Sequence, residues 1–393
     1  MPVELLAEIF RLAYGDESRS TGPICRALLP FDRASRFRQV EVKSLEQLAR
    51  LVQLVEGNKE IGTFVTSLSL RDGDAPEVTL NGVNEVLERF LPLLPRLETL
   101  SVDFVDARDV DEAVFAALPF ACPSLHTLIF PWSWPDPSDP DLYAALAACP
   151  SLRTLELFCE RADYASRHKR QIARPGSATL PFTSLTLGGY WLDDSGFARL
   201  ANSCPLLSDL HLEHDSDDPA FDEILPALPP SLTSLYIVVE DAIEGPPCDH
   251  LLPRFHRLTH LYPDGPFTNP LTLADNLRRL PSLTSISFLP GCTVDADALL
   301  TLVSGPHRHP ALRTLSLNLF FPGVKRLVEA GRENGIVIDG GAVEALETYH
   351  KFYADWRKVV VYGQGEGGDF SELREFLGAE EAEKELGARG IVV

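Results

Sequence analysis

The sequence is short of positive charge. It has 35 Lys and Arg residues against 57 Asp and Glu residues among 393, which gives a formal net charge of -22 at pH 7. A surface with this balance repels phosphate backbones and anionic lipid headgroups. We therefore expect neither nucleic acid nor a membrane surface as a partner.

Cysteine is also sparse, and its spacing carries no metal signature. The seven cysteines are odd in number and scattered, without a C-x-x-C pair or a His/Cys pairing at zinc spacing. Reduced, mostly buried thiols are expected, with no metal and no cofactor.

The sequence also lacks the usual targeting signals. Its start has Glu4 and Glu8 where a signal peptide needs basic residues, and no apolar run approaches the roughly 20 residues of a membrane-spanning helix. The expected compartment is the cytoplasm or the nucleus.

What the sequence does contain is one short phrase, L-x-x-L-x-L, repeated many times. Ten copies recur at separations of about 25 to 32 residues, a period typical of stacked repeats. The copies lie at 65–70, 97–102, 125–130, 152–157, 182–187, 207–212, 232–237, 258–262, 283–288 and 312–317. Their alternation predicts short strands with leucines on one face and small polar residues on the other. Parallel stacking of these strands would bury the leucine face.

Helical stretches separate the strands. They are predicted at 82–94, 109–118, 141–149, 195–203 and 296–303. Several begin at an Asp or Ser cap, and they usually end at a proline, which stops a helix before the next strand. The helices should therefore form a convex side and the strands a concave one.

These phrases, with junctions such as Cys122-Pro123 and Cys149-Pro150, resemble the ribonuclease-inhibitor-like and cysteine-containing leucine-rich repeats. The resemblance covers about residues 64 to 319. It implies an α/β solenoid with a curved parallel sheet on the concave side and helices on the convex side. It says little about the ligand, because this fold hosts many unrelated binding activities.

The segment before the repeats is different. Residues 2–13 have the pattern of an amphipathic helix that starts at a proline, and a second apolar part follows at 24–42. Together they are similar to the divergent F-box segments of fungal repeat proteins. The resemblance implies that the helix docks on the Skp-type adaptor of a cullin ubiquitin ligase, through Pro2, Leu5, Leu6, Ile9 and Phe10. The alternative is that this segment only caps the open end of the solenoid.

Three regions follow from these patterns. We expect an F-box-like helical segment over 1–45, a solenoid of about ten repeats over 46–320, and a helical C-terminal cap with a flexible acidic tail over 321–393. Helices are predicted in this last region at 324–334 and 341–358. Residues 359–368 formally match a strand followed by G-x-G-x-x-G, but only 25 residues remain after them, too few for a dinucleotide-binding unit.

The concave face follows directly from the phrase, because the residues that flank its second leucine point away from the core. Most of these residues are small hydroxyls: Ser67, Ser69, Thr99, Ser101, Thr127, Thr154, Ser184, Thr186, Ser285, Ser287, Thr314 and Ser316. The larger groups among them are candidates for substrate binding: Glu156, Asp209, His211, Tyr236, His260 and Tyr262. Tyr offers a large contact area and a hydrogen-bonding tip. The alternative is that these are ordinary solvated positions and that the ligand sits elsewhere.

Irregular insertions supply a second candidate surface, since insertions in a solenoid emerge at one rim, often near the ligand. Residues 131–140 contain Trp132 and Trp134, and residues 158–180 contain a basic cluster. Exposed tryptophans beside a concave face are typical of binding hot spots. Alternatively, they fill a gap between repeats.

We therefore expect a substrate receptor that binds a Skp-type adaptor and an unknown protein substrate, monomeric outside the ligase complex. The second hypothesis is a free-standing scaffold or inhibitor, and the third is an enzyme. His211 with Asp209 and Glu213 invites a metal or acid–base interpretation. Neighbouring strand positions point to opposite faces, however, so we expect no catalytic, metal-binding or cofactor-binding residue.

Overall fold

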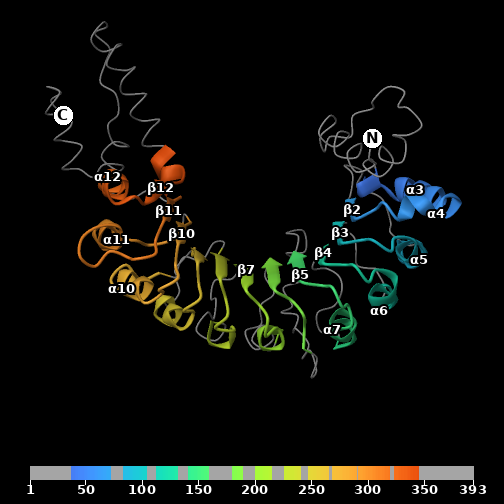
Figure 1. Cartoon of the computed structure of the whole chain (residues 1–393), viewed down its shortest axis with the longest axis horizontal. Coiled ribbons are helices and arrows are strands. Elements are labelled where there is room, and N and C mark those ends of the chain that lie inside the picture. Colours follow the sequence, from blue (N-terminus) through green and yellow to red (C-terminus); the bar gives the residue numbers. More distant parts are fainter. Residues whose placement is uncertain are drawn as a thin grey trace, which may run out of the picture. The chain divides into compact units, whose positions relative to one another are not determined.

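The computed structural model describes residues 37–71, 83–103, 112–131, 140–158, 179–188, 200–214, 225–239, 247–264, 268–289, 291–318 and 323–344. The chain divides into two compact units, one ending at Leu207 and the next beginning at Ser208. Each unit is a run of strands alternating with helical turns (Figure 1).

The described residues of the first unit form six strands. They are β1 Gln39–Val42, β2 Ser67–Arg71, β3 Thr99–Asp103, β4 Thr127–Pro131, β5 Thr154–Phe158 and β6 Ser184–Gly188. The helical elements between them are α3 Leu45–Gly57, α4 Lys59–Gly62, α5 Val83–Phe90, the 3-10 helix η1 Leu91–Leu93, α6 Glu112–Ala121 and α7 Pro140–Ala147. Each strand pairs in parallel with the next one along the chain.

The second unit repeats this organisation. Its strands are β7 Asp209–His214, β8 Ser234–Val239, β9 His260–Tyr262, β10 Ser285–Phe288, β11 Thr314–Leu317 and β12 Val337–Asp339. Its helical elements are the 3-10 helix η4 Asp249–Arg254, α10 Leu273–Arg278, α11 Ala296–Val303 and α12 Val324–Asn334. Pairing is again parallel between successive strands.

The twelve strands in the described part of the chain belong to one sheet, whose order follows the chain. The ten leucine phrases become β2 to β11, in the predicted parallel arrangement. The fold is therefore the α/β leucine-rich-repeat solenoid expected from the sequence. Two of its helices, α11 and α12, have the predicted bounds.

The core is built from register-paired leucines. In the second unit Leu210, Leu235, Leu261, Ile286 and Leu315 occupy equivalent positions on neighbouring strands. All five are at most 2% exposed. Each such side chain contributes about 1.5 to 3 kcal/mol on burial. The opposite side of each strand is left with the polar residues of the phrase, and we call this side the open face.

Threonines at the start of the strands add side-chain bonds between repeats. The carbonyl oxygen of Thr233 accepts bonds from the backbone N–H and the Oγ1 hydroxyl of Thr259, both at 2.8 Å. The carbonyl of Thr259 accepts the same two bonds from Thr284, at 2.9 and 3.0 Å. These extra donors fix the parallel register of β8, β9 and β10.

The described cysteines lie in the core. Cys122, Cys149, Cys204, Cys248 and Cys292 are buried and form no disulfide bond, as expected. Burial raises the pKa of Cys122, Cys204 and Cys292 to about 12, so these thiols stay protonated at neutral pH.

One buried carboxylate joins two turns of the second unit. Asp249 is 1% exposed and lies in η4. It accepts bonds from the Asn269 N–H at 3.1 Å, the Thr272 hydroxyl at 3.0 Å and the Asn276 amide at 2.8 Å. A buried carboxylate needs such partners, and these bonds hold η4 against the start of α10.

A buried histidine does the same between the segment before β11 and the segment before β10. His309 is 2% exposed, and its Nε2 lies 3.0 Å from the carbonyl oxygen of Leu280. Its Nδ1 accepts bonds from the N–H groups of Ala311 and Leu312 at 3.3 and 3.1 Å. Burial lowers the pKa of His309, and an acceptor role for Nδ1 requires the neutral ring.

Two strands lie outside the ten leucine phrases. Gln39–Val42 falls within the predicted helical segment 1–45, yet it pairs with β2 and buries Val42, so the helical prediction is wrong for these residues. Val337–Asp339 lies between the predicted helices 324–334 and 341–358, where no element was predicted, and it pairs with β11 as β12. Each is a strand because an adjoining strand offers it free backbone groups.

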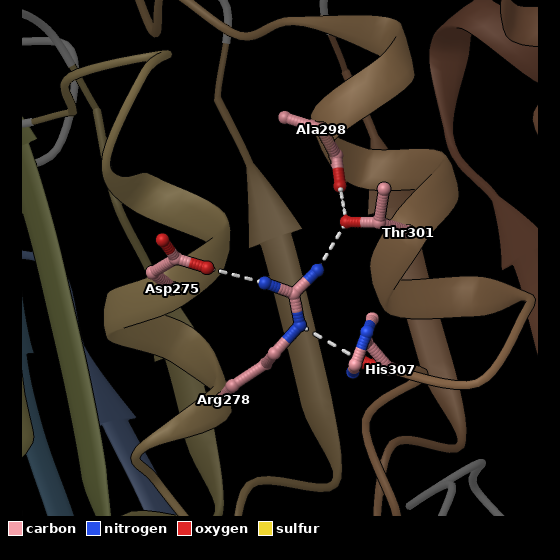
Figure 2. A network of polar contacts seen from close by, with 5 residues as sticks. All are labelled: Asp275, Arg278, Ala298, Thr301 and His307. Carbon is pink, nitrogen blue, oxygen red and sulfur yellow. Dashed lines mark hydrogen bonds and ion pairs between the residues drawn. The ribbon is translucent and has the colours of Figure 1, made fainter.

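An arginine clamp links the helices of two successive repeats, as Figure 2 shows. The Arg278 guanidinium, at the end of α10, donates to Asp275, to the Thr301 hydroxyl on α11 and, at 2.9 Å, to the carbonyl oxygen of His307. Thr301 in turn donates to the carbonyl of Ala298 at 2.6 Å. Because the side chain of Arg278 is only 26% exposed, these bonds are partly shielded from water.

Replacing this arginine tests the clamp. Arg278→Met keeps the length of the side chain and removes its donors, so we expect a loss of about 1 to 3 kcal/mol in the free energy of unfolding by urea. The matched control is Arg326→Met, which removes only an exposed pair with Asp297 at 3.3 Å. The control should change stability by less than about 1 kcal/mol. Equal effects of the two substitutions would contradict the clamp.

Candidate functional site

The open face of the second unit brings together five of the predicted substrate-binding residues. Parallel pairing places Asp209 beside Ser234 and Ser234 beside His260. Two residues further along the same strands, His211 lies beside Tyr236 and Tyr236 beside Tyr262. We call these sets the polar row (Asp209, Ser234, His260) and the aromatic row (His211, Tyr236, Tyr262).

The three rings of the aromatic row are in contact. The ring centroids of His211 and Tyr236 are 4.1 Å apart at an interplanar angle of 62°, an edge-to-face arrangement. Those of Tyr236 and Tyr262 are 5.1 Å apart at 34°. Such pairs contribute about 0.5 to 1.5 kcal/mol each beyond their burial. All three side chains are half-buried, so the row is rigid and still presents ring surface to solvent.

The side chain of His211 is partly shielded from water. Its Nε2 atom is buried and has no hydrogen-bond partner among the described residues. Burial lowers the pKa of His211, so the ring is neutral at pH 7. The aromatic row therefore carries no positive charge at neutral pH.

The polar row is more exposed. Asp209 and His260 are exposed and Ser234 is half-buried. Asp209 accepts a bond from the Ser208 hydroxyl at 2.6 Å, and the His260 Nδ1 lies 2.9 Å from the Thr259 hydroxyl. Both larger side chains are thus oriented by the residue that precedes them.

Glu156, the sixth predicted residue of this face, lies on β5 in the first unit. Its register partners are Ile129 on β4 and Thr186 on β6. It is half-buried, and burial raises the pKa of its carboxyl group. Neither register partner offers it a positive charge.

The remaining predicted site residues lie outside the described part of the chain. These are the adaptor-binding residues Pro2, Leu5, Leu6, Ile9 and Phe10 and the rim residues Trp132 and Trp134. Their roles stay predictions.

The structure adds a polar cluster that the sequence analysis did not single out. Asn318 donates from Nδ2 to the Ser287 hydroxyl at 3.2 Å and accepts from the Gly341 N–H at 3.1 Å. Ser316 donates to the carboxylate of Asp339. Asn318 follows directly on the last phrase, whereas nothing in the sequence marked Asp339 as a strand residue of the open face.

The described residues show no metal centre. No group of three or more His, Cys, Asp or Glu side chains in this part of the chain could hold an ion. Nor does any of its helices have the length and apolar content needed to cross a membrane.

The twelve-stranded parallel sheet, with its leucine core and polar open face, defines a leucine-rich-repeat protein. No family model matches the sequence, and no curated protein matches it either.

Similar folds occur among solved structures. The leucine-rich-repeat protein LegL7 from Legionella pneumophila is 16% identical with a TM-score of 0.43, over 77% of this chain and 89% of that one. Rad7, from its complex with Elc1 in yeast, is 14% identical with a TM-score of 0.45, over 79% and 81%. Human 5T4, also called Wnt-activated inhibitory factor 1 or trophoblast glycoprotein, is 15% identical with a TM-score of 0.32, over 71% and 79%.

The raised pKa of Glu156 predicts a stability change with pH. A carboxyl group with a folded-state pKa above its ordinary 4.5 destabilises the fold increasingly as pH rises past 4.5. Glu156→Gln removes this charge, so its free energy of unfolding should exceed that of the wild type at pH 7. The gain should vanish as pH falls below 4.5, where the carboxyl is protonated in the folded and unfolded chain alike.

Urea unfolding at a series of pH values measures this difference. Glu88→Gln, a change of the same charge at an exposed position on α5, serves as the control and should show no such gain. A Glu156→Gln variant that is less stable than the wild type at pH 7 would contradict the desolvation of Glu156.

Proposed function

We propose that this chain is a non-enzymatic protein-binding subunit, and that a partner protein docks on the open face of β7, β8 and β9. The observation that supports this proposal most directly is the aromatic row, in which Tyr236 contacts the rings of His211 and Tyr262 beside exposed Asp209 and His260. Rigid tyrosines with accessible ring surface give large contact area at little entropic cost. Ser234 and the small hydroxyls of β10 and β11 let the partner approach closely.

The finer proposal is that the partner is a ubiquitin-ligase substrate. The N-terminal segment would bind a Skp-type adaptor through Pro2, Leu5, Leu6, Ile9 and Phe10, as its F-box resemblance implies. This proposal concerns the part of the segment that precedes β1. β1 lies near the end of the segment and pairs with β2, and Leu48 and Val55 of α3 are fully buried beside it. These last residues therefore form the first layer of the stack, as the capping alternative expects of them.

Adaptor binding is tested with purified proteins. The full chain should capture a recombinant Skp-type adaptor, and Leu6→Asp or Ile9→Asp should abolish capture, because a buried unpaired charge costs several kcal/mol. The matched control is Leu54→Asp, at an exposed apolar position on α3. Absence of capture by the wild type, or equal capture by all variants, would remove the ligase role and leave a free-standing scaffold or inhibitor.

Partner docking is tested by placing a photo-crosslinking amino acid at Tyr262 in cells that express the full chain. We expect a discrete crosslinked partner protein from this position. The same amino acid at Leu271, which is 87% exposed and precedes α10, should give none. Crosslinking at Leu271 that equals crosslinking at Tyr262 would contradict docking on the open face.

A further inference from the structure

The strands of the second unit contain neither lysine nor arginine. Their sequences are DLHLEH, SLYIVV, HLY, SISF, TLSL and VID. Asp209 and Asp339 are exposed on them. A ligand that lies across these strands therefore meets aromatic rings, imidazoles and carboxylates.

The basic residues of this unit lie elsewhere. Arg257, Arg279 and Arg308 are exposed in the segments that lead from a helical turn into β9, β10 and β11. Arg254 is engaged with the carbonyls of Leu225 and Leu228 at 3.1 and 3.3 Å. The arginines named here thus lie outside the strands of the open face.

The aromatic row has the arrangement that attracts a cation. The electron-rich face of a tyrosine ring binds an ammonium or guanidinium group, and Tyr236 lies between two other rings. Asp209 is the register partner of Ser234, two residues from Tyr236, so its carboxylate is a diagonal neighbour of that ring. Ser234 is small and leaves space between the carboxylate and His260.

We propose that the aromatic row binds an arginine or lysine side chain from an extended segment of the partner protein, with the cation over Tyr236 and beside Asp209. This inference rests on the proposed function and adds the chemistry of the partner. The charge of the whole chain acts in the same direction, because a net charge of -22 raises the local concentration of basic segments. His211 adds no competing charge at neutral pH, because burial lowers its pKa.

The test uses a fluorescein-labelled peptide, Gly-Ser-Arg-Gly-Ser-Arg-Gly-Ser, and anisotropy titrations of the full chain. Two further peptides replace both arginines by citrulline, a neutral analogue of similar shape, or by glutamate. We expect the arginine peptide to bind most tightly. Tyr236→Leu should weaken its binding about two- to fivefold, and Tyr236→Phe, which keeps the ring, should not.

A charge control separates a local site from general attraction by an acidic protein. Asp209→Asn and Asp297→Asn change the net charge equally, but Asp297 lies on α11. Only Asp209→Asn should weaken the arginine peptide. Equal weakening by both variants would show diffuse attraction and would overturn the proposal.

Other occupants of the face give different results. Tighter binding of the glutamate peptide would mean an acidic partner, and self-association that Tyr236→Leu abolishes would mean a second copy of this chain. Either result overturns the proposal. Thermal unfolding of Tyr236→Leu and Tyr236→Phe establishes that both variants fold.

Docking of a partner protein and binding of a cationic side chain can be rejected separately. A crosslinked partner at Tyr262 together with equal binding of the arginine and citrulline peptides would reject the cationic ligand and leave protein docking intact. Loss of the position-specific crosslink would reject docking itself, whatever the peptides do.

Discussion

The structure depends on burial of the apolar residues of the strands, chiefly leucines, on the same side of a parallel sheet. Leu210, Leu235, Leu261 and their equivalents are register partners, so their burial also fixes which residues share the open face. A slip of one residue in any strand would exchange its buried and open sides. The aromatic row therefore exists because the leucines behind it are aligned.

Polar groups inside the repeats reinforce this alignment. Asp249 joins successive repeats through three hydrogen bonds, His309 does so through its contact with the carbonyl of Leu280, and Arg278 does so from the helix side. Glu156 and His211 differ, because burial disfavours their charged forms and His211 Nε2 lacks a described partner. Natural proteins keep such unfavourable groups where a function benefits from them. This contrast favours a binding role for the open face over a purely structural one.

Much of this fold could be predicted from alternation and period alone. The leucine phrase located β2 to β11, and the Asp295 cap marked the start of α11. The same alternation placed Asp209, His211, Tyr236, His260 and Tyr262 on the open face.

The elements that escaped prediction have weak local signals. Gln39–Val42 and Val337–Asp339 have no leucine phrase, and their strand conformation comes from pairing with a neighbouring strand. The helix α3, Leu45–Gly57, was not predicted, because the expected boundary between the first two regions falls at its first residue. Ring contacts in the aromatic row could not be predicted either. The alternation of the sequence gives the face of the sheet on which a side chain lies, but not its rotamer.

The most direct test of this account is cysteine crosslinking across the open face with a short thiol-reactive linker. Paired cysteines at His211 and Tyr236, and at Tyr236 and Tyr262, occupy adjacent strands about 4.8 Å apart and should join readily. Cysteines at His211 and Tyr262 are two strands apart, about 9.6 Å, and should not join through a linker that spans one strand spacing. Failure of both adjacent pairs, or equal reaction of all three, would contradict the parallel register on which the aromatic row depends.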